Sequence, residues 1–332
     1  MAISIDDIKK LRAMTGAGLA DVKKALTEAE GDFDKAKELL RERGLAIAAK
    51  RSDRETSNGC VLVKCVDGFA ATIALKCETD FVANGADFIA LTQSILDAAI
   101  ATKAKDIETV KELTLADGQK VQDAVTQRSG ITGEKMELDG YNVLEGENIE
   151  IYDHMGKHML TTMVQLNKPA VEVGHKLAMQ VAAMKPVALD AQSVEQKILD
   201  EEYKTAVEKT KLEQVEKYVE VVLKKAGINP NLVDSEDHIE SNIKKGWLTE
   251  EQAKEARELK VKAAEEKAAT LNPNMIENIA KGRVQKFLKE SCLVDQEFQF
   301  GDGDKATVSQ WLAQQDKELK IVAFKRFTLV AE

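Results

Sequence analysis

Residues 61–77 contain the pattern that most restricts how this chain can fold. Apolar side chains recur at every second position, at 61, 63 and 65 and again at 69, 71, 73, 75 and 77. A period of two is typical of a β-strand with one buried face, and the dipeptide Asp67-Gly68 between the runs favours a two-residue hairpin turn. The chain therefore contains an antiparallel hairpin, around which a sheet must be completed.

Helical patterns surround this hairpin. Residues 1–44 predict three short helices, separated by TGAG at 15–18 and by Gly31-Asp32, with Gly44 ending the third. After the hairpin, apolar spacing predicts further helices at about 86–101, 117–128 and 175–183, and strands at 134–144, 147–154 and 158–167. Residues 59–183 are therefore expected to form an α+β domain with antiparallel strands.

The second half of the chain is mostly helical in pattern. Residues 190–270 are charged and poor in glycine, and we expect a helical excursion with little core of its own. Leu212, Val215, Val219 and Val222 have coiled-coil spacing, and this seam could pair with a second copy or fold against its own chain. A helix at about 275–290 follows, and the closing run 320–330 predicts a strand that returns to the early sheet.

Composition limits the classes of partner. The net charge is −10, whereas broad nucleic-acid-binding surfaces are usually basic, so no direct contact with nucleic acid is expected. No apolar run approaches 18 residues, so no membrane span is expected. The start, MAISIDDIKK, lacks the layout of a secretory signal, and the expected location is the cytoplasm.

The common catalytic motifs are absent from the sequence. There is no phosphate-binding G-x-x-x-x-G-K-[ST], no G-x-G-x-x-G and no G-x-S-x-G, and TGAG is best explained as a tight turn between helices. The cysteines at 60, 65, 77 and 292 form no C-x-x-C pair and are expected to be buried free thiols. His154 and His158 are four apart, but Gly156 between them disfavours a metal site. We therefore expect no enzymatic activity, no cofactor and no bound metal.

Several blocks of sequence resemble the bacterial translation elongation factor Ts family. They are LRAMTGAGLADVKKALTEAEGDFDKAKELLRERG at 11–44, KCETDFVANGADF at 76–88, VAAMKPVAL at 181–189, IENIAKGRVQKFLKESCLVDQEF at 276–298 and the ending IVAFKRFTL. These blocks span most of the chain in the order in which the family has them. TGAG followed by D-x-KKAL, together with TDFV after a strand, is a specific combination.

The resemblance implies a division of the chain into several parts. It implies a three-helix, ubiquitin-associated-like module at 1–50 and a core of two antiparallel-sheet-plus-helix subdomains, at 57–130 and at 131–190, with strand 319–330 added to the second. It further implies a coiled-coil-like helical protrusion at 191–270 and a C-terminal helical module at 271–318. Residues 205–270 hold more helical sequence than is usual for the family's protrusion, so contacts of that part are not carried over.

The resemblance also implies a function and a site. It implies a guanine-nucleotide exchange factor that binds elongation factor Tu, both GDP-bound and nucleotide-free, displaces its magnesium ion and promotes GDP release in translation elongation. Thr79, Asp80, Phe81 and Val82 match the motif that meets the partner's nucleotide domain. Lys23 and His154 match secondary contact positions of the family.

Each of these residues also has an ordinary explanation. From spacing alone Phe81 would be a core residue and Asp80 the cap of the next turn, while Lys23 would be a solvated helix charge and His154 a hydrogen-bonded turn histidine. An alternative function is that of a non-catalytic adaptor whose N-terminal three-helix module binds ubiquitin-like or other helical partners.

Overall fold

The computed structural model describes residues 3–15, 17–51, 53–301, 303 and 305–330. The chain divides into two compact units, the first made of Met1–Pro186 and Glu297–Glu332 and the second of Val187–Gln296. In chain order, the elements of the first unit are α1 (Ile5–Thr15), α2 (Leu19–Glu28), α3 (Phe33–Ala49), β1 (Asn58–Val66), β2 (Phe69–Cys77), α4 (Asp80–Ala83), α5 (Ala86–Thr102), α6 (Ile107–Glu112), α7 (Val121–Thr132), β3 (Glu137–Glu145), β4 (Ile149–Asp153), the 3₁₀ turn η1 (His154–Gly156), β5 (Leu160–Leu166), α8 (Val171–Met184), α13 (Val308–Gln315) and β6 (Ile321–Thr328).

Within the described residues the strands form two antiparallel sheets, with the orders β1-β2-β3 and β4-β5-β6. The predicted hairpin is confirmed, because β1 and β2 pair in register and Asp67 and Gly68 both have positive φ, at 47° and 71°. The last strand is not added to the early sheet. β6 pairs with β5, as the resemblance implies, although far in sequence from it.

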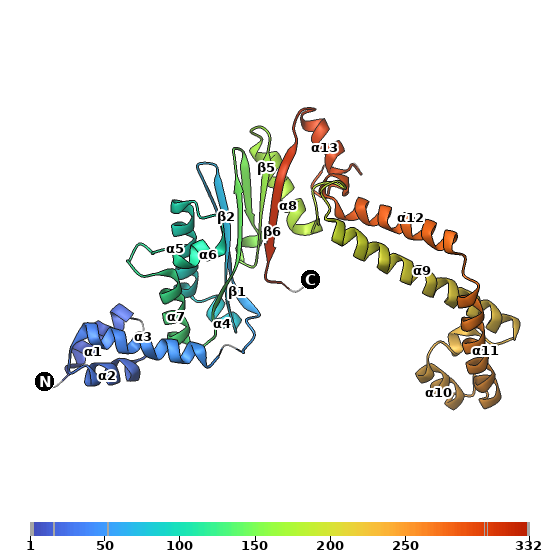
Figure 1. Cartoon of the computed structure of the whole chain (residues 1–332), viewed down its shortest axis with the longest axis horizontal. Helices are drawn as coiled ribbons and strands as arrows, with labels where there is room; N and C mark the ends of the chain where they lie inside the picture. The colour runs from blue at the N-terminus through green and yellow to red at the C-terminus, as the bar shows by residue number, and fades with distance from the viewer. Residues whose placement is uncertain (1–2, 16, 52, 302, 304, 331–332) are drawn as a thin grey trace. The chain divides into compact units, whose positions relative to one another are not determined.

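The two sheets pack face to face and are each covered by a helix on the outside. α5 packs on β1 and β2, and α8 packs on β4 and β5 (Figure 1). Between the sheets, the hydroxyls of Thr72 and Thr161 lie 3.2 Å apart in a buried hydrogen bond. The strand β3 lies within the range 131–190 but pairs with β2, so the boundary between the sheets falls after Glu145.

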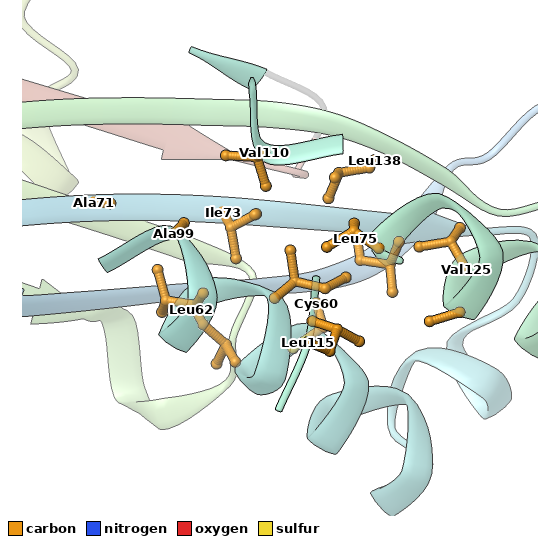
Figure 2. Close-up of a cluster of buried hydrophobic side chains, with 14 of the residues drawn as sticks. Cys60, Leu62, Ala71, Ile73, Leu75, Ala99, Val110, Leu115, Val125 and Leu138 are labelled. Atoms are coloured by element: carbon orange, nitrogen blue, oxygen red, sulfur yellow. The ribbon is translucent and has the colours of Figure 1, made fainter. Parts of the chain in front are cut away.

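The main core lies between the first sheet and its covering helices. Figure 2 shows side chains from β1, β2, β3 and the helices meeting there, among them Cys60, Leu62, Ile73, Leu75 and Leu138. The expected helix at 117–128 begins later, at Val121, and the short helix α6 precedes it. The reason is Gly118, whose φ of +86° places it in a turn before α7.

The N-terminal module has the three helices that the sequence predicts. Leu11, Val22, Ala25 and Leu26 form its buried centre. TGAG joins α1 to α2, with Gly18 as the residue before α2, whereas Gly16 lies outside the described residues. The prediction that Gly44 ends the third helix is wrong, because α3 continues to Ala49 and Gly44 is buried inside it.

Gly44 serves instead as a packing position against α7. A side-chain carbon added at Gly130 of α7 would lie 2.8 Å from the Cα of Gly44, which no stable contact permits. One added at Gly44 would meet nothing closer than the Thr126 carbonyl oxygen, at 3.6 Å. The two glycines therefore let α3 and α7 approach closely, and only one of them strictly requires the missing side chain.

This asymmetry gives a testable prediction about stability. Gly130→Ala should destabilise the packing of α3 on α7 by about 1–3 kcal/mol, because the added methyl forces the helices apart. Gly44→Ala should be neutral or stabilising by up to about 1 kcal/mol, because alanine favours a helix over glycine. Thermal unfolding of the two single variants, followed by circular dichroism, checks the difference, and equal shifts in both would contradict this account.

The second unit is helical. Its elements are α9 (Gln196–Lys225), the 3₁₀ turn η2 (Pro230–Leu232), α10 (Glu236–Lys244), α11 (Glu250–Ala269), α12 (Pro273–Ser291) and the 3₁₀ turn η3 (Leu293–Asp295). α9 packs along both α11 and α12 (Figure 1). The range 271–318, which the resemblance assigns to one C-terminal module, is divided between the two units at Gln296.

The expectation of little core in this part of the chain is wrong. Val233, Ile239, Ala253 and their neighbours form a buried cluster where α9, η2, α10 and α11 meet. Val219, one residue of the predicted apolar seam, packs against this cluster, so this part of the seam folds against its own chain. Leu212 remains 59% exposed.

Candidate functional site

The segment TDFV forms a single helical turn between β2 and α5. β2 ends at Cys77, and Thr79 precedes α4 with extended backbone angles. The Thr79 hydroxyl oxygen accepts a hydrogen bond from the Val82 amide at 3.3 Å, so Thr79 is the N-cap of this turn. Asp80 is exposed in the first turn and is not the cap, which corrects the alternative explanation for that residue.

Phe81 projects into solvent from this turn. Its side chain is 87% exposed, so it does not belong to the core that spacing alone would assign it to. Val82, by contrast, packs partly against the main core. A hollow of about 360 Å³ lies beside Phe81, between α4, α5 and α7. Arg128 and Asp87, which form an ion pair of 3.0 Å, are among the residues that line it. An exposed aromatic ring beside a hollow can insert into, or receive, a side chain of another protein.

Glu134, two residues after the last residue of α7, holds the start of this turn through hydrogen bonds. Its carboxylate oxygen Oε2 accepts hydrogen bonds from the backbone amides of Glu78 and Thr79, both at 3.1 Å. The other oxygen, Oε1, accepts from the Thr79 hydroxyl at 2.6 Å. Hydrogen bonds to an ionised carboxylate are among the stronger ones in proteins, so the start of the turn is held firmly.

Glu78 makes the reverse connection. Its carboxylate accepts from the Lys135 backbone amide at 2.6 Å and from the Arg54 guanidinium at 3.0 Å. These bonds, the Lys135 amide first and Arg54 after it, lower the pKa of Glu78 below its ordinary value. The Lys135 ammonium also donates to the Arg54 carbonyl at 2.9 Å. Sequence reasoning missed Glu78, Glu134 and Arg54, because no local pattern signals contacts between residues that lie 24 to 57 positions apart.

Lys23 lies on the exposed face of α2, shortly after the TGAG turn. His154 is also exposed, in η1 between β4 and β5, and its Nδ1 lies 3.1 Å from the Tyr152 hydroxyl. Its ring packs edge-on against that of Tyr152, so it is hydrogen-bonded as the ordinary explanation has it, yet accessible. Met155 beside it is 71% exposed. Across the described part of the chain, no hydrogen bond or ion pair joins Lys23 or His154 to the TDFV turn.

The arrangement of the histidine, cysteine and acidic side chains bears on metal and thiol chemistry. Among the described residues, no three or more His, Cys, Asp or Glu side chains are grouped so that they could hold a metal ion. His158 instead lies 2.5 Å from the Asp153 carboxylate. Burial raises the pKa of Cys60 and of Cys77 to about 12, which makes both thiols poor nucleophiles at neutral pH. No helix in the described ranges combines the length and apolar character that crossing a bilayer requires.

Comparisons with known proteins show which family the chain belongs to. The family described as Elongation factor TS matches residues 78–331, a range that begins at Glu78 beside the TDFV turn. Elongation factor Ts of Phocaeicola vulgatus is 59% identical over 332 residues, covering the full length of both chains. The proteins of that name from Parabacteroides distasonis and Porphyromonas gingivalis are 57% and 40% identical, again over the full length of each. This chain therefore belongs to the elongation factor Ts family.

Proposed function

We propose that this chain is a guanine-nucleotide exchange factor that binds elongation factor Tu in its GDP-bound form, displaces the magnesium ion and promotes GDP release so that GTP can bind. As a member of the elongation factor Ts family, the chain is a translation elongation factor. The observation that carries the finer proposal is the exposure of Phe81 on a turn fixed from behind by Glu134. In this proposal the chain acts by binding elongation factor Tu and catalyses no chemical step of its own.

The proposed mechanism follows from how a nucleotide is held. In a GTP-binding protein the magnesium ion bridges the nucleotide phosphates to protein groups, and it tolerates little departure from octahedral geometry. A ring inserted between helices of the nucleotide domain shifts the groups that support the ion, and GDP then binds less tightly. Asp80, exposed beside Phe81, would contact polar groups near the insertion and help to orient it, without replacing a ligand of the metal.

Phe81 cannot account for the whole effect. A thousandfold acceleration of GDP release requires about 4 kcal/mol of destabilisation, whereas burying one phenylalanine side chain contributes about 1.5–3 kcal/mol. Further contacts must share the task, and we assign them to the surfaces around Lys23 and His154. Met14 and Leu19, at either end of the TGAG turn, are 54% and 57% exposed, and Met155 adjoins His154. Exposed apolar side chains of this kind suit a protein interface.

The exchange cycle then follows from linkage. If this chain weakens the affinity of elongation factor Tu for nucleotide, nucleotide weakens the affinity of elongation factor Tu for this chain by the same factor. An abundant nucleotide such as GTP therefore displaces the exchange factor once GDP has left.

The test is a direct measurement of nucleotide release. We expect the full chain to accelerate release of fluorescent GDP from elongation factor Tu by about a thousandfold or more at saturation, as followed by stopped-flow fluorescence. Adding excess magnesium should reduce the acceleration, because it opposes loss of the ion. Release at the spontaneous rate, with complex formation verified by gel filtration, would refute the proposal.

A further inference from the structure

We infer that Glu134 is a positioning residue for Phe81, acting through Thr79 to fix the direction in which the ring is presented. This inference rests on the proposed function, since it concerns the side chain that is proposed to enter elongation factor Tu. Glu134 lies 55 positions after Thr79, between the last residue of α7 and the start of β3. It is not itself part of the TDFV motif.

The hydrogen bonds form a relay from the turn to Glu134, with the Val82 amide donating to the Thr79 hydroxyl and that hydroxyl donating to the Glu134 carboxylate. A threonine hydroxyl has one proton to donate and lone pairs to accept with. The Thr79 proton is committed to Glu134, in a bond of 2.6 Å, which leaves a lone pair of the same oxygen directed at the Val82 amide. Phe81 lies between these two anchored positions. The carboxylate thereby fixes the orientation of the Thr79 hydroxyl and, through it, the hydrogen bond that this hydroxyl accepts from the Val82 amide.

Glu134 is itself held in place. Its carbonyl accepts from the Ser129 hydroxyl at 2.5 Å, and its amide donates to the Thr132 hydroxyl at 3.2 Å. Gly133 before it ends α7 with φ of +76°, where a side chain would be strained. Glu78 completes the connection, because its carboxylate accepts the Lys135 amide while Glu134 accepts the Glu78 amide. Two carboxylates thus join the segments 78–79 and 134–135 reciprocally.

This brace matters because α4 cannot be stable by itself. It has four residues, and isolated helices shorter than about 12–15 residues are marginal in water. Phe81 gains little from its own burial, since its side chain is almost fully exposed. A ring that was free to change direction would lose that freedom on binding, at a cost in affinity, whereas a fixed ring avoids the loss.

The experiment compares Glu134→Ala, Glu134→Gln and their combinations with Phe81→Ala. We expect Glu134→Ala to lower the acceleration of GDP release about tenfold, as for lost charge-assisted bonds. Glu134→Gln should fall between that variant and the unmodified chain, because the amide oxygen still accepts from the backbone. In the Phe81→Ala background, Glu134→Ala should cause no further loss, since it acts through the ring.

A second measurement does not involve the partner. Hydrogen exchange in the free chain should show faster exchange of peptides covering residues 78–84 in Glu134→Ala, with other regions unchanged. Glu108→Ala is the matched control, because Glu108 is an exposed carboxylate of the same unit that pairs with Lys111 and does not touch the turn. It should leave both exchange of these peptides and GDP release as they are.

The outcomes separate the two proposals. Unchanged hydrogen exchange at 78–84 in Glu134→Ala, or an equal loss of GDP release with and without Phe81, would overturn the role of Glu134. If Glu134→Ala is unfolded at the assay temperature, Glu134→Gln decides the question instead. Unaltered GDP release by Glu134→Gln would overturn the role of Glu134. If the unmodified chain fails to accelerate release, the exchange function fails, while the hydrogen-exchange result still decides whether Glu134 holds the turn.

Discussion

Phe81→Ala is expected to remove most of this chain's acceleration of GDP release while leaving its fold intact. Burial of the ring in elongation factor Tu would contribute about 1.5–3 kcal/mol. Losing that free energy corresponds to a roughly ten- to hundredfold slower stimulated release. Because the side chain is 87% exposed in the free chain, its removal should change the free energy of unfolding by no more than about 0.5 kcal/mol. Stopped-flow release of fluorescent GDP and thermal unfolding measure the two quantities separately.

A matched control removes another exposed aromatic side chain. Trp247 lies between α10 and α11 of the second unit and is 64% exposed, with the Lys245 ammonium 5.1 Å from its ring centre. Trp247→Ala should leave GDP release unaltered, which would show that loss of an exposed ring is not by itself damaging. Stimulated release by Phe81→Ala at the rate of the unmodified chain would defeat the role proposed for the ring.

The elements that could be predicted from sequence are those that local chemistry determines. Asp67-Gly68 adopts the positive φ values that its turn requires, and the alternation on either side places β1 and β2. The caps behave similarly, since Ser235 accepts from the His238 amide and Thr249 forms a capping box with Gln252. In each case the deciding contact lies within a few residues, so a short window of sequence contains the information.

The wrong predictions depend on partners distant in the chain. Glycine often ends a helix, so the sequence predicts that role for Gly44, but the contact that decides its role is with Gly130 in α7. The apolar run 320–330 predicts a strand in the early sheet, whereas the structure pairs this strand with β5. The spacing of Val219 likewise could not reveal that α10 and α11 would fold back to build a core around it.

In the candidate site, too, local features could be predicted from the sequence and features that depend on distant residues could not. The resemblance supplied Thr79, Asp80, Phe81 and Val82, and the N-cap role of Thr79 is a local pattern. The exposure of Phe81 could not be derived from sequence spacing, which by itself assigns the residue to the core. The position of the turn is set by hydrogen bonds to Glu134 and by the packing of α4 on β1, β2 and α5.

Phe88→Ala provides the largest expected effect on stability. Phe88 lies in the first turn of α5, seven residues after Phe81, and is 1% exposed within the main core. Truncating a buried phenylalanine removes its transfer free energy and leaves a cavity, at a cost of about 3–5 kcal/mol. Phe88→Leu should cost clearly less, because much of the volume is retained. Denaturant unfolding of the two variants and of the unmodified chain measures these differences.

The measurement must isolate the unit that contains Phe88, because two units can unfold in separate transitions. The chain has two tryptophans, Trp247 in the second unit and Trp311 in the first. Trp311 is buried and stacks on Phe298 with ring centres 3.9 Å apart, so in a Trp247→Phe background its fluorescence reports on the first unit alone. In that background Phe88→Ala should shift the transition strongly and Phe81→Ala hardly at all. A large destabilisation by Phe81→Ala would mean that the ring supports its own molecule, and the same substitution at two nearby phenylalanines would no longer separate binding from folding.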